Sequence, residues 1–389
     1  MEKRAYLAFI FLGIAGTVHG LALPFLIDAF SLTLGAAGTL FLAGSFGYLA
    51  ASTTYPRIIR TTSVKPVLAW GAVIMGTANL LIPLLPIWCF VLAVALIAGF
   101  GSGVIEVGFN ALVAGLPETR AKVSMNWLHF FFGVGALVGP LLLSRLLAVS
   151  QEWAFLYWVP GACFLLFSLL WLRQDSRELV AQHGREASDS GDVADLYRST
   201  TFRLLLTAMF IYVGAEVALV GWVTTFLASE VGASRETAPL GISVLWLGLT
   251  VGRGICGRIA PHVSTRTLLL VLHIGSTAAL FTLVGTNSVV AAMLLLFFVG
   301  LFFSAIFPTL MLHGTAEFPW ATAQISGGLV TAAGLGALLM PVLLGFVGDI
   351  ASLRAGVFLV GCSMAASAAM TYLLRPEGVT HREAIDCDS

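Results

Sequence analysis

Charged residues are scarce in this sequence, and their scarcity excludes an ordinary soluble domain. Asp, Glu, Lys and Arg make up 10% of the 389 positions, whereas hydrophobic residues make up 58%. A soluble domain usually carries about 25% charged residues and at most about 50% apolar ones. The mean hydropathy of +0.96 is instead typical of a protein with many membrane spans. Because the formal net charge is zero, we expect no nucleic acid as a partner.

Cysteine is also scarce, and no pair of cysteines has the spacing of a metal or redox site. Four of the five stand in apolar runs, where a small buried hydrophobe is the usual role; the full set is Cys89, Cys163, Cys256, Cys362 and Cys387. The sequence also lacks a nucleophile–base pair, a phosphate loop and a metal cluster. This disfavours an enzyme and predicts neither cofactor nor metal. The start, Met-Glu-Lys-Arg before an apolar run, predicts a retained first span rather than a signal peptide.

Long apolar runs are what the sequence has in abundance. A membrane-spanning helix needs roughly 20 predominantly apolar residues. Cutting the chain at charge clusters and turn residues predicts twelve such spans, at about 5–27, 34–54, 66–85, 88–116, 123–147, 153–172, 202–228, 238–259, 267–286, 288–314, 322–348 and 352–374. The predicted fold class is therefore an all-α membrane protein with twelve transmembrane helices.

The predicted spans divide six and six around one long polar stretch. This stretch, 173–201, carries charges of both signs together with Gly and Ser, and it predicts a partly helical cytoplasmic linker. We therefore expect an N-terminal six-helix bundle at 1–172, a C-terminal six-helix bundle at 202–374 and a cytoplasmic tail at 375–389.

The distribution of Lys and Arg predicts the orientation of the spans. If the N-terminus lies inside, the outer side holds only Arg145, Arg235 and Arg354, and the inner side holds the other seventeen of the twenty basic residues. Cytoplasmic loops of membrane proteins carry such an excess of positive charge. We therefore expect a multi-pass protein of the cell membrane with both termini in the cytoplasm.

An internal repeat relates the two groups of six spans. The segment GVGALVGPLLL at 133–143 matches GLGALLMPVLL at 334–344 in seven of eleven positions, at an offset of 201 residues. A repeat of six spans keeps the same orientation in both copies, so the two bundles are expected to be pseudo-symmetric about an axis along the membrane normal. In transporters built this way the binding site lies near the midplane, between the halves.

Two carboxylates stand inside predicted spans, and they are the strongest functional signal in the sequence. Glu106 lies in the run GSGVIEVGFNALVAG at 101–115, and Glu216 lies in the seventh span. A charge at the bilayer centre costs at least about 2.5–3.5 kcal/mol, so such acids usually face water or an ion pathway. Burial disfavours the ionised form of a carboxyl, so such a group can bind a proton on one side of the membrane and release it on the other. Each of the two carboxyls is therefore a candidate for ion coupling. His19 is a third candidate, as a relay, a sugar contact or a helix contact.

Other polar and aromatic residues of the spans are candidates for contact with a substrate. Asn110 lies one turn from Glu106 on the same helix face, and Asn126 and His129 share a face by their spacing of three. An aromatic ring stacks on the apolar face of a pyranose, although lipid contact or core packing is the commoner role. The predicted substrate-binding set is Asn110, Asn126, His129, Glu216, Trp127, Tyr212, Trp222 and Gln324.

Two arginines follow the second span, and two more stand at the end of the eighth span, the corresponding span of the other half. They are candidates for cytoplasmic gates, and their alternative role is to anchor the spans at the cytoplasmic surface. These residues are Arg57, Arg60, Arg253 and Arg258.

Several motifs together resemble the fucose permease-like branch of the major facilitator superfamily. They are GSGVIEVGFN at 101–110, NWLHFFFGVGA at 126–136, YVGAE at 212–216, GRGICGRIAP at 252–261, FPTL at 307–310 and MPVLLGFVGD at 340–349. This branch comprises fucose–galactose–glucose proton symporters and sodium-dependent glucose transporters. The resemblance covers nearly the whole chain, and it implies that Glu106 is the coupling acid and that Asn126 faces the cavity.

The sequence departs from this family pattern in the first and seventh spans. In TVHGLALP at 17–24, Gly20 replaces the acid that the fucose permease pattern has there, and His19 stands beside it. Glu216 stands where the fucose permease has an amide. Fucose specificity is therefore not implied, and the coupling cation is left open between H⁺ and Na⁺.

The expected function is cation-coupled symport of a sugar or similar small polar solute by alternating access. The alternative is an exporter of drugs, lipids or other amphiphiles, because GALVGP at 135–140 resembles an antiporter motif of the fifth span. The expected partners are the solute, the coupling cation and the lipid bilayer, and the expected state is a monomer.

Overall fold

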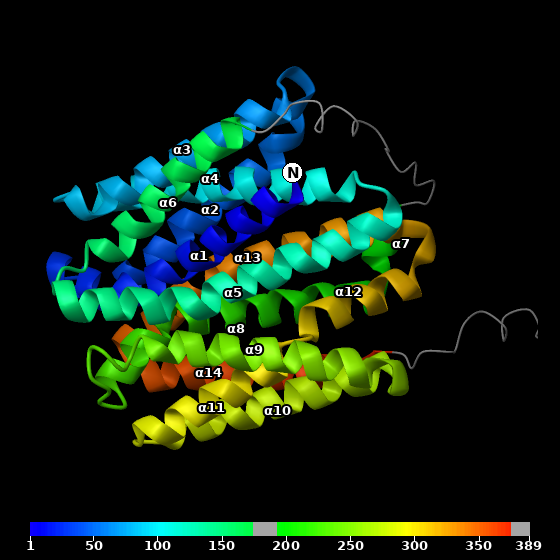
Figure 1. Ribbon diagram of the computed structural model, residues 1–389. Helices are drawn as coiled ribbons and strands as arrows, with labels where there is room; N and C mark the ends of the chain where they lie inside the picture. Colours follow the sequence, from blue (N-terminus) through cyan, green and yellow to red (C-terminus); the bar gives the residue numbers. More distant parts are fainter. Residues whose placement is uncertain (174–192, 375–389) are drawn as a thin grey trace, which may run out of the picture.

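The computed structural model describes residues 1–173 and 193–374, and every regular element in them is a helix (Figure 1). Residues 174–192 of the predicted linker at 173–201 and the whole predicted tail at 375–389 lie outside the described residues. Twelve helical segments are long and apolar enough to cross a membrane. The predicted fold class and number of spans are therefore confirmed.

The first six spans are six long helices, with a short 3₁₀ turn, η1 (Ile82–Leu84), at the end of the third. They are α1 (Glu2–Phe30), α2 (Leu34–Thr61), α3 (Val64–Leu81), α4 (Trp88–Ala114), α5 (Glu118–Ser150) and α6 (Phe155–Leu172). The last six spans follow the short helix α7 (Val193–Arg198). These six spans contain seven helices, because α11 and α12 together form the tenth span. The helices are α8 (Thr200–Ser229), α9 (Leu240–Ile259), α10 (Thr265–Gly285), α11 (Val289–Phe303), α12 (Ile306–Glu317), α13 (Thr322–Ile350) and α14 (Leu353–Leu373). Two 3₁₀ turns, η3 (Ala260–His262) and η4 (Pro319–Ala321), lie between them.

The tenth span is broken, which the sequence analysis did not predict. It was expected as one helix at 288–314, but the structure divides it into α11 and α12 at Ser304 and Ala305. Pro308 explains the break, because proline has no amide hydrogen to donate to the carbonyl four residues earlier, which is that of Ser304. The carbonyl oxygen of Ser304 is thereby released from the helix ladder.

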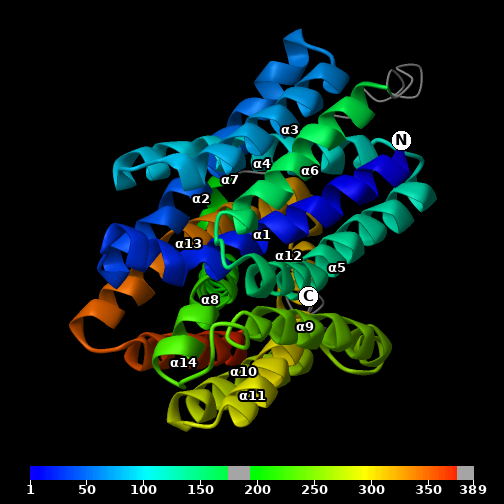
Figure 2. The same ribbon diagram turned by 60° about the vertical axis from the view of Figure 1, so that its left-hand side comes forward.

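The same helix pairs recur in the two halves, as the internal repeat predicted. In the first half α1 contacts α5, α2 contacts α4, and α3 contacts both α4 and α6. In the second half the corresponding pairs are α8 with α13, α9 with α11, and α10 with both α11 and α14. In Figures 1 and 2 the first half, α1 to α6, lies beside the second half, α8 to α14, and the contacts between the halves pair α13 with α2, α5 with α9 and α1 with α8.

Glycines at repeat-related positions allow the closest of these contacts. A Cβ on Gly47 of α2 would lie 1.9 Å from the carbonyl oxygen of Leu96 in α4. Its counterpart at the offset of 201 residues is Gly248 of α9, where a Cβ would lie 2.0 Å from the carbonyl oxygen of Phe297 in α11. Backbone lies against backbone at both places, so no larger side chain fits without separating the helices.

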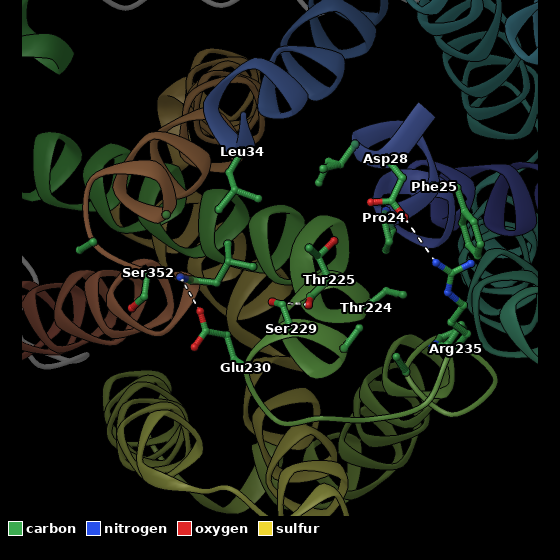
Figure 3. Close-up of a pocket in the computed structure, with 17 residues that line it drawn as sticks. Pro24, Phe25, Asp28, Leu34, Thr224, Thr225, Ser229, Glu230, Arg235 and Ser352 are labelled. Carbon is green, nitrogen blue, oxygen red and sulfur yellow. Dashed lines mark hydrogen bonds and ion pairs between the residues drawn. The ribbon is translucent and has the colours of Figure 1, made fainter. Parts of the chain in front are cut away.

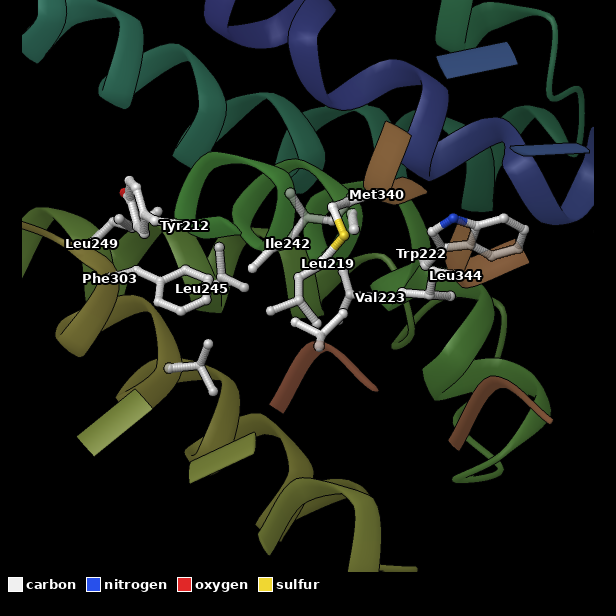
Figure 4. Close-up of a cluster of buried hydrophobic side chains, with 14 of the residues drawn as sticks. Tyr212, Leu219, Trp222, Val223, Ile242, Leu245, Leu249, Phe303, Met340 and Leu344 are labelled. Carbon is white, nitrogen blue, oxygen red and sulfur yellow. The ribbon is translucent and has the colours of Figure 1, made fainter. Parts of the chain in front are cut away.

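The second half has its core around α8 (Figure 4). Tyr212 and Trp222 of this helix are 2% and 0% exposed, and they pack among aliphatic side chains from α9 and α13. The indole Nε1 of Trp222 donates a hydrogen bond of 2.8 Å to the carbonyl oxygen of Pro341 in α13. This places the helix that carries Glu216 rigidly at the centre of its half.

Candidate functional site

The two halves touch mainly at one end of the bundle. We call the end that carries Met1 the terminus side, and the end that carries the α1–α2 connection the far side. On the far side, Asp349 at the end of α13 accepts hydrogen bonds of 2.6 and 2.7 Å from the amides of Leu34 and Gly35 at the start of α2. A Cβ on Gly20 of α1 would lie 2.3 Å from the carbonyl oxygen of Val220 in α8. The far side is therefore closed.

The halves separate towards the terminus side. Along one face of α9, Trp246 lies 5.7 Å from the ring of Phe132, and Thr250 lies 4.0 Å from the place of a Cβ on Gly133. One and two turns further along the same face, Gly254 and Gly257 have no atom within 4 Å of the place of a Cβ. The loss of close contacts along this face indicates that the halves diverge towards the terminus side and that the space between them opens there.

Glu106 lies in α4 of the first half without a positively charged partner in the described part of the chain. It is partly buried, and the side chain of Tyr48 in α2 hydrogen-bonds to it. One turn away, the buried Oδ1 of Asn110 makes no hydrogen bond with any described residue. A carboxyl with a neutral neighbour and no cation is suited to bind a proton or a monovalent cation itself.

Glu216 lies in α8 of the second half and has a different environment. The hydroxyl of Tyr212, one turn before it, donates a short hydrogen bond to its carboxylate. The guanidinium of Arg253 in α9 is close enough to interact electrostatically with Glu216, with Tyr212 and with His129 from the other half. Glu216 therefore interacts with a positive charge at a distance beyond that of an ion pair, whereas Glu106 has no such interaction with the described residues.

The break in the tenth span holds Arg253 in place. Its Nε donates a hydrogen bond of 3.4 Å to the carbonyl oxygen of Ser304, the one that Pro308 leaves without a helical donor. The preceding residue, Phe303, packs its ring against that of Tyr212 at 5.5 Å between centroids. Arg253 was predicted as a gate residue, and this arrangement was not predicted; its one signal in the sequence is Pro308, four residues after Ser304.

His19 and Trp222 lie deeper in helix contacts than the other candidates. The Nδ1 of His19 is 3.0 Å from the hydroxyl of Tyr157 in α6, and its ring meets that of Phe41. Trp222 is fully buried beside Phe41 and Pro341. This placement favours a packing role for Trp222 and a polar contact within the first half for His19.

The predicted residues of α5 divide between two sides of the helix. His129 packs against Phe9 of α1 and also lies near Arg253, so it faces the space between the halves, and Asn126 shares its face. Trp127 is 46% exposed and packs on Phe130 and Phe131, on the side away from Arg253.

The remaining predicted residues lie towards the terminus side. The buried Oε1 of Gln324, at the start of α13, makes no hydrogen bond. Arg57, Arg60 and Arg258 are exposed near the ends of their helices, and Arg258 bonds the carbonyl of Gly254 in its own helix. Within residues 1–173 and 193–374 no cluster of three His, Cys, Asp or Glu side chains could hold a metal ion.

Comparison with known proteins identifies the family. The model of the Major Facilitator Superfamily matches residues 5–327, which is most of the chain. The chain belongs to this superfamily. It is a transporter of the membrane rather than an enzyme, and the resemblance seen in the sequence motifs is confirmed.

Individual relatives are distant but cover most of the chain. It is 23% identical over 353 residues to the glucose/mannose transporter GlcP of Bacillus subtilis, covering 88% of this chain and 86% of that one. It is 25% identical over 273 residues to the sodium-dependent glucose transporter 1 of Xenopus laevis, covering 63% of this chain and 55% of that one. Among solved structures, the fucose:proton symporter FucP of E. coli superposes with a TM-score of 0.63 at 18% identity, covering 96% of this chain and 98% of that one.

Proposed function

We propose that this protein is a secondary active transporter that couples the symport of a sugar to a monovalent cation. One observation carries the proposal. Glu106 and Glu216 lie in the interior of membrane spans from different halves, and only Glu106 lacks a positive partner among the described residues. A site with one uncompensated negative charge is suited to exchange a cation once per cycle, whether H⁺ or Na⁺.

The sugar is proposed to bind between the halves, beside the coupling acid. Asn110 and Gln324 offer amide groups whose oxygens make no hydrogen bond, and Asn126, His129 and Glu216 face the same space. Hydroxyl groups of a sugar both donate and accept, so they match a mixture of amides, imidazole and carboxylate. An amphiphile would need a mostly apolar wall, so this set supports the sugar and not the exporter alternative.

Transport is proposed to proceed by rocking of the two bundles, 1–172 and 202–374. The closed far-side contacts support an assignment of this structure to the state that is open on the terminus side, and the opposite state requires those contacts to part. The excess of basic residues on the terminus side makes it the cytoplasmic side of the cell membrane by the positive-inside rule. The protein is proposed to act as a monomer. A cysteine introduced at Lys65 and labelled only from outside intact cells would contradict this orientation.

Glu106→Gln tests the proposal, because it removes the charge and keeps the shape. In proteoliposomes loaded with glucose, exchange should survive in this variant while accumulation against a gradient is lost. Glu152→Gln, which alters an exposed acid after α5, is the matched control and should accumulate glucose normally. Concentrative uptake by the Glu106 variant would refute the coupling role, and absence of any sugar transport by the parent would refute the proposed function.

A further inference from the structure

A cavity lies on the far side, and neither Glu106 nor Glu216 lines it. It has a volume of about 570 Å³ and lies between the ends of α1, α8 and α13 and the starts of α2 and α14 (Figure 3). Binding pockets for small molecules have volumes of about 300–1,000 Å³. The cavity is therefore large enough for a monosaccharide.

Two buried hydroxyls line this cavity without a hydrogen-bond partner. Thr224 and Thr225 are 2% and 6% exposed, and the Oγ1 atom of each makes no hydrogen bond within residues 1–173 and 193–374. A threonine in a helix usually bonds the carbonyl of the preceding turn, as Ser229 does here with the carbonyl of Thr225 at 2.8 Å. Because an unpaired buried hydroxyl is unfavourable, the two threonines are suited to a ligand that offers its own donors and acceptors.

The charges around the cavity balance one another. The carboxylate of Asp28 lies 3.5 Å from the guanidinium of Arg235 at one side of the cavity (Figure 3). The carboxylate of Glu230 lies 3.3 Å from Arg354 and accepts a hydrogen bond of 3.0 Å from the amide of Leu353. Each lining acid thus has a cationic partner, so the cavity favours a neutral polar ligand over an ion.

A packed layer separates this cavity from the central space. Thr224 is eight residues after Glu216 in α8, which corresponds to about 12 Å along the helix axis. Between these levels, the close approach of Gly20 to Val220 and the contact of Trp222 with Phe41 fill the space between the halves. A ligand in the far-side cavity would therefore wait outside the closed contact.

We propose that the far-side cavity is an outer subsite for a neutral polyhydroxyl solute, held by Thr224 and Thr225 before the halves part on that side. The inference rests on the proposed function, since it assigns the subsite to the transported sugar class. It adds a binding step that precedes the central site and that operates only for solute arriving from the far side.

The variant Thr224→Val/Thr225→Val tests this assignment, because it removes both hydroxyls and keeps the side-chain shape. Glucose transport is measured in vesicles of both orientations. The half-saturating concentration should rise about tenfold for glucose supplied on the far side, as expected for the loss of one or two hydrogen bonds. It should stay unchanged for glucose supplied on the terminus side.

Two further variants control the measurement. Thr224→Ser/Thr225→Ser keeps both hydroxyls and should behave as the parent. Thr207→Val removes a hydroxyl that bonds the carbonyl of Arg203 in the same helix at 2.9 Å, and it should change neither direction. An equal change in both directions, a loss of transport from both sides, or no change from the far side would overturn the subsite. Failure of the parent to transport any sugar would instead overturn the proposed function, and the subsite with it.

Discussion

Replacing Asp349 with Asn should loosen the closed far side and shift the protein towards its opposite state. The carboxylate of Asp349 accepts hydrogen bonds of 2.6 and 2.7 Å from the amides of Leu34 and Gly35, across the two halves. These amides are the first of α2, where a helix has unpaired donors and favours a negative charge. An amide side chain removes the charge and can accept through its single oxygen only.

The size of the shift follows from these contacts. Hydrogen bonds to a charged group contribute about 1.5–3 kcal/mol and neutral ones about 0.5–1.5 kcal/mol. Since Asp349 is exposed, water compensates part of the loss, and we take a net weakening of about 1.4 kcal/mol. That corresponds to a tenfold change in the ratio of the two states.

Pulsed EPR would measure this ratio through the distance between spin labels at Ser31 and Ile350, one on each half at the far side. The longer distance should gain population about tenfold in Asp349→Asn relative to the parent. Asp28→Asn is the matched control, because its pair with Arg235 also joins the halves but both side chains are largely exposed. It should shift the ratio less than about threefold. An unchanged distribution in Asp349→Asn, or an equal shift in the control, would refute the reasoning.

Three other substitutions test the remaining parts of the argument. Arg253→Gln should leave Glu216 without its positive neighbour, so that Glu216 also binds a cation. Flux measurements should then give two cations per sugar instead of one. The double variant Arg253→Gln/Glu216→Gln should restore one cation per sugar. Gly248→Ala should lower the thermal unfolding temperature, because its Cβ would lie 2.0 Å from a backbone oxygen and overpacking costs about 1–3 kcal/mol. Gly257→Ala is the control and should leave the unfolding temperature unchanged, because there is open space around Gly257. Asn126→Ala should weaken glucose binding about ten- to a hundredfold in calorimetry, as expected for an unpaired polar group, and unchanged affinity would remove it from the site.

The spans and the repeat could be predicted from the sequence because they depend on local composition. Twenty apolar residues must form a helix in a bilayer, since no water is available to bond the backbone. The positions of Gly47 and Gly248 follow the same offset of 201 residues as the sequence repeat, and the structure pairs their helices in the same way. The sequence also singled out Glu106 and Glu216, because a charge in an apolar run stands out without any knowledge of neighbours.

Only the tertiary structure decided which of the two acids has a counter-charge. Arg253 is 37 positions from Glu216 in the sequence, and its position depends on the packing of α9 against α8 and on a carbonyl that Pro308 releases in another span. Likewise, nothing local in the sequence places Tyr48 at Glu106 or joins Asp349 to the start of α2. Sequence patterns predict whether each segment lies in an apolar or a polar environment. The partner of a buried charge depends instead on packing between segments far apart in the chain, which local patterns do not predict.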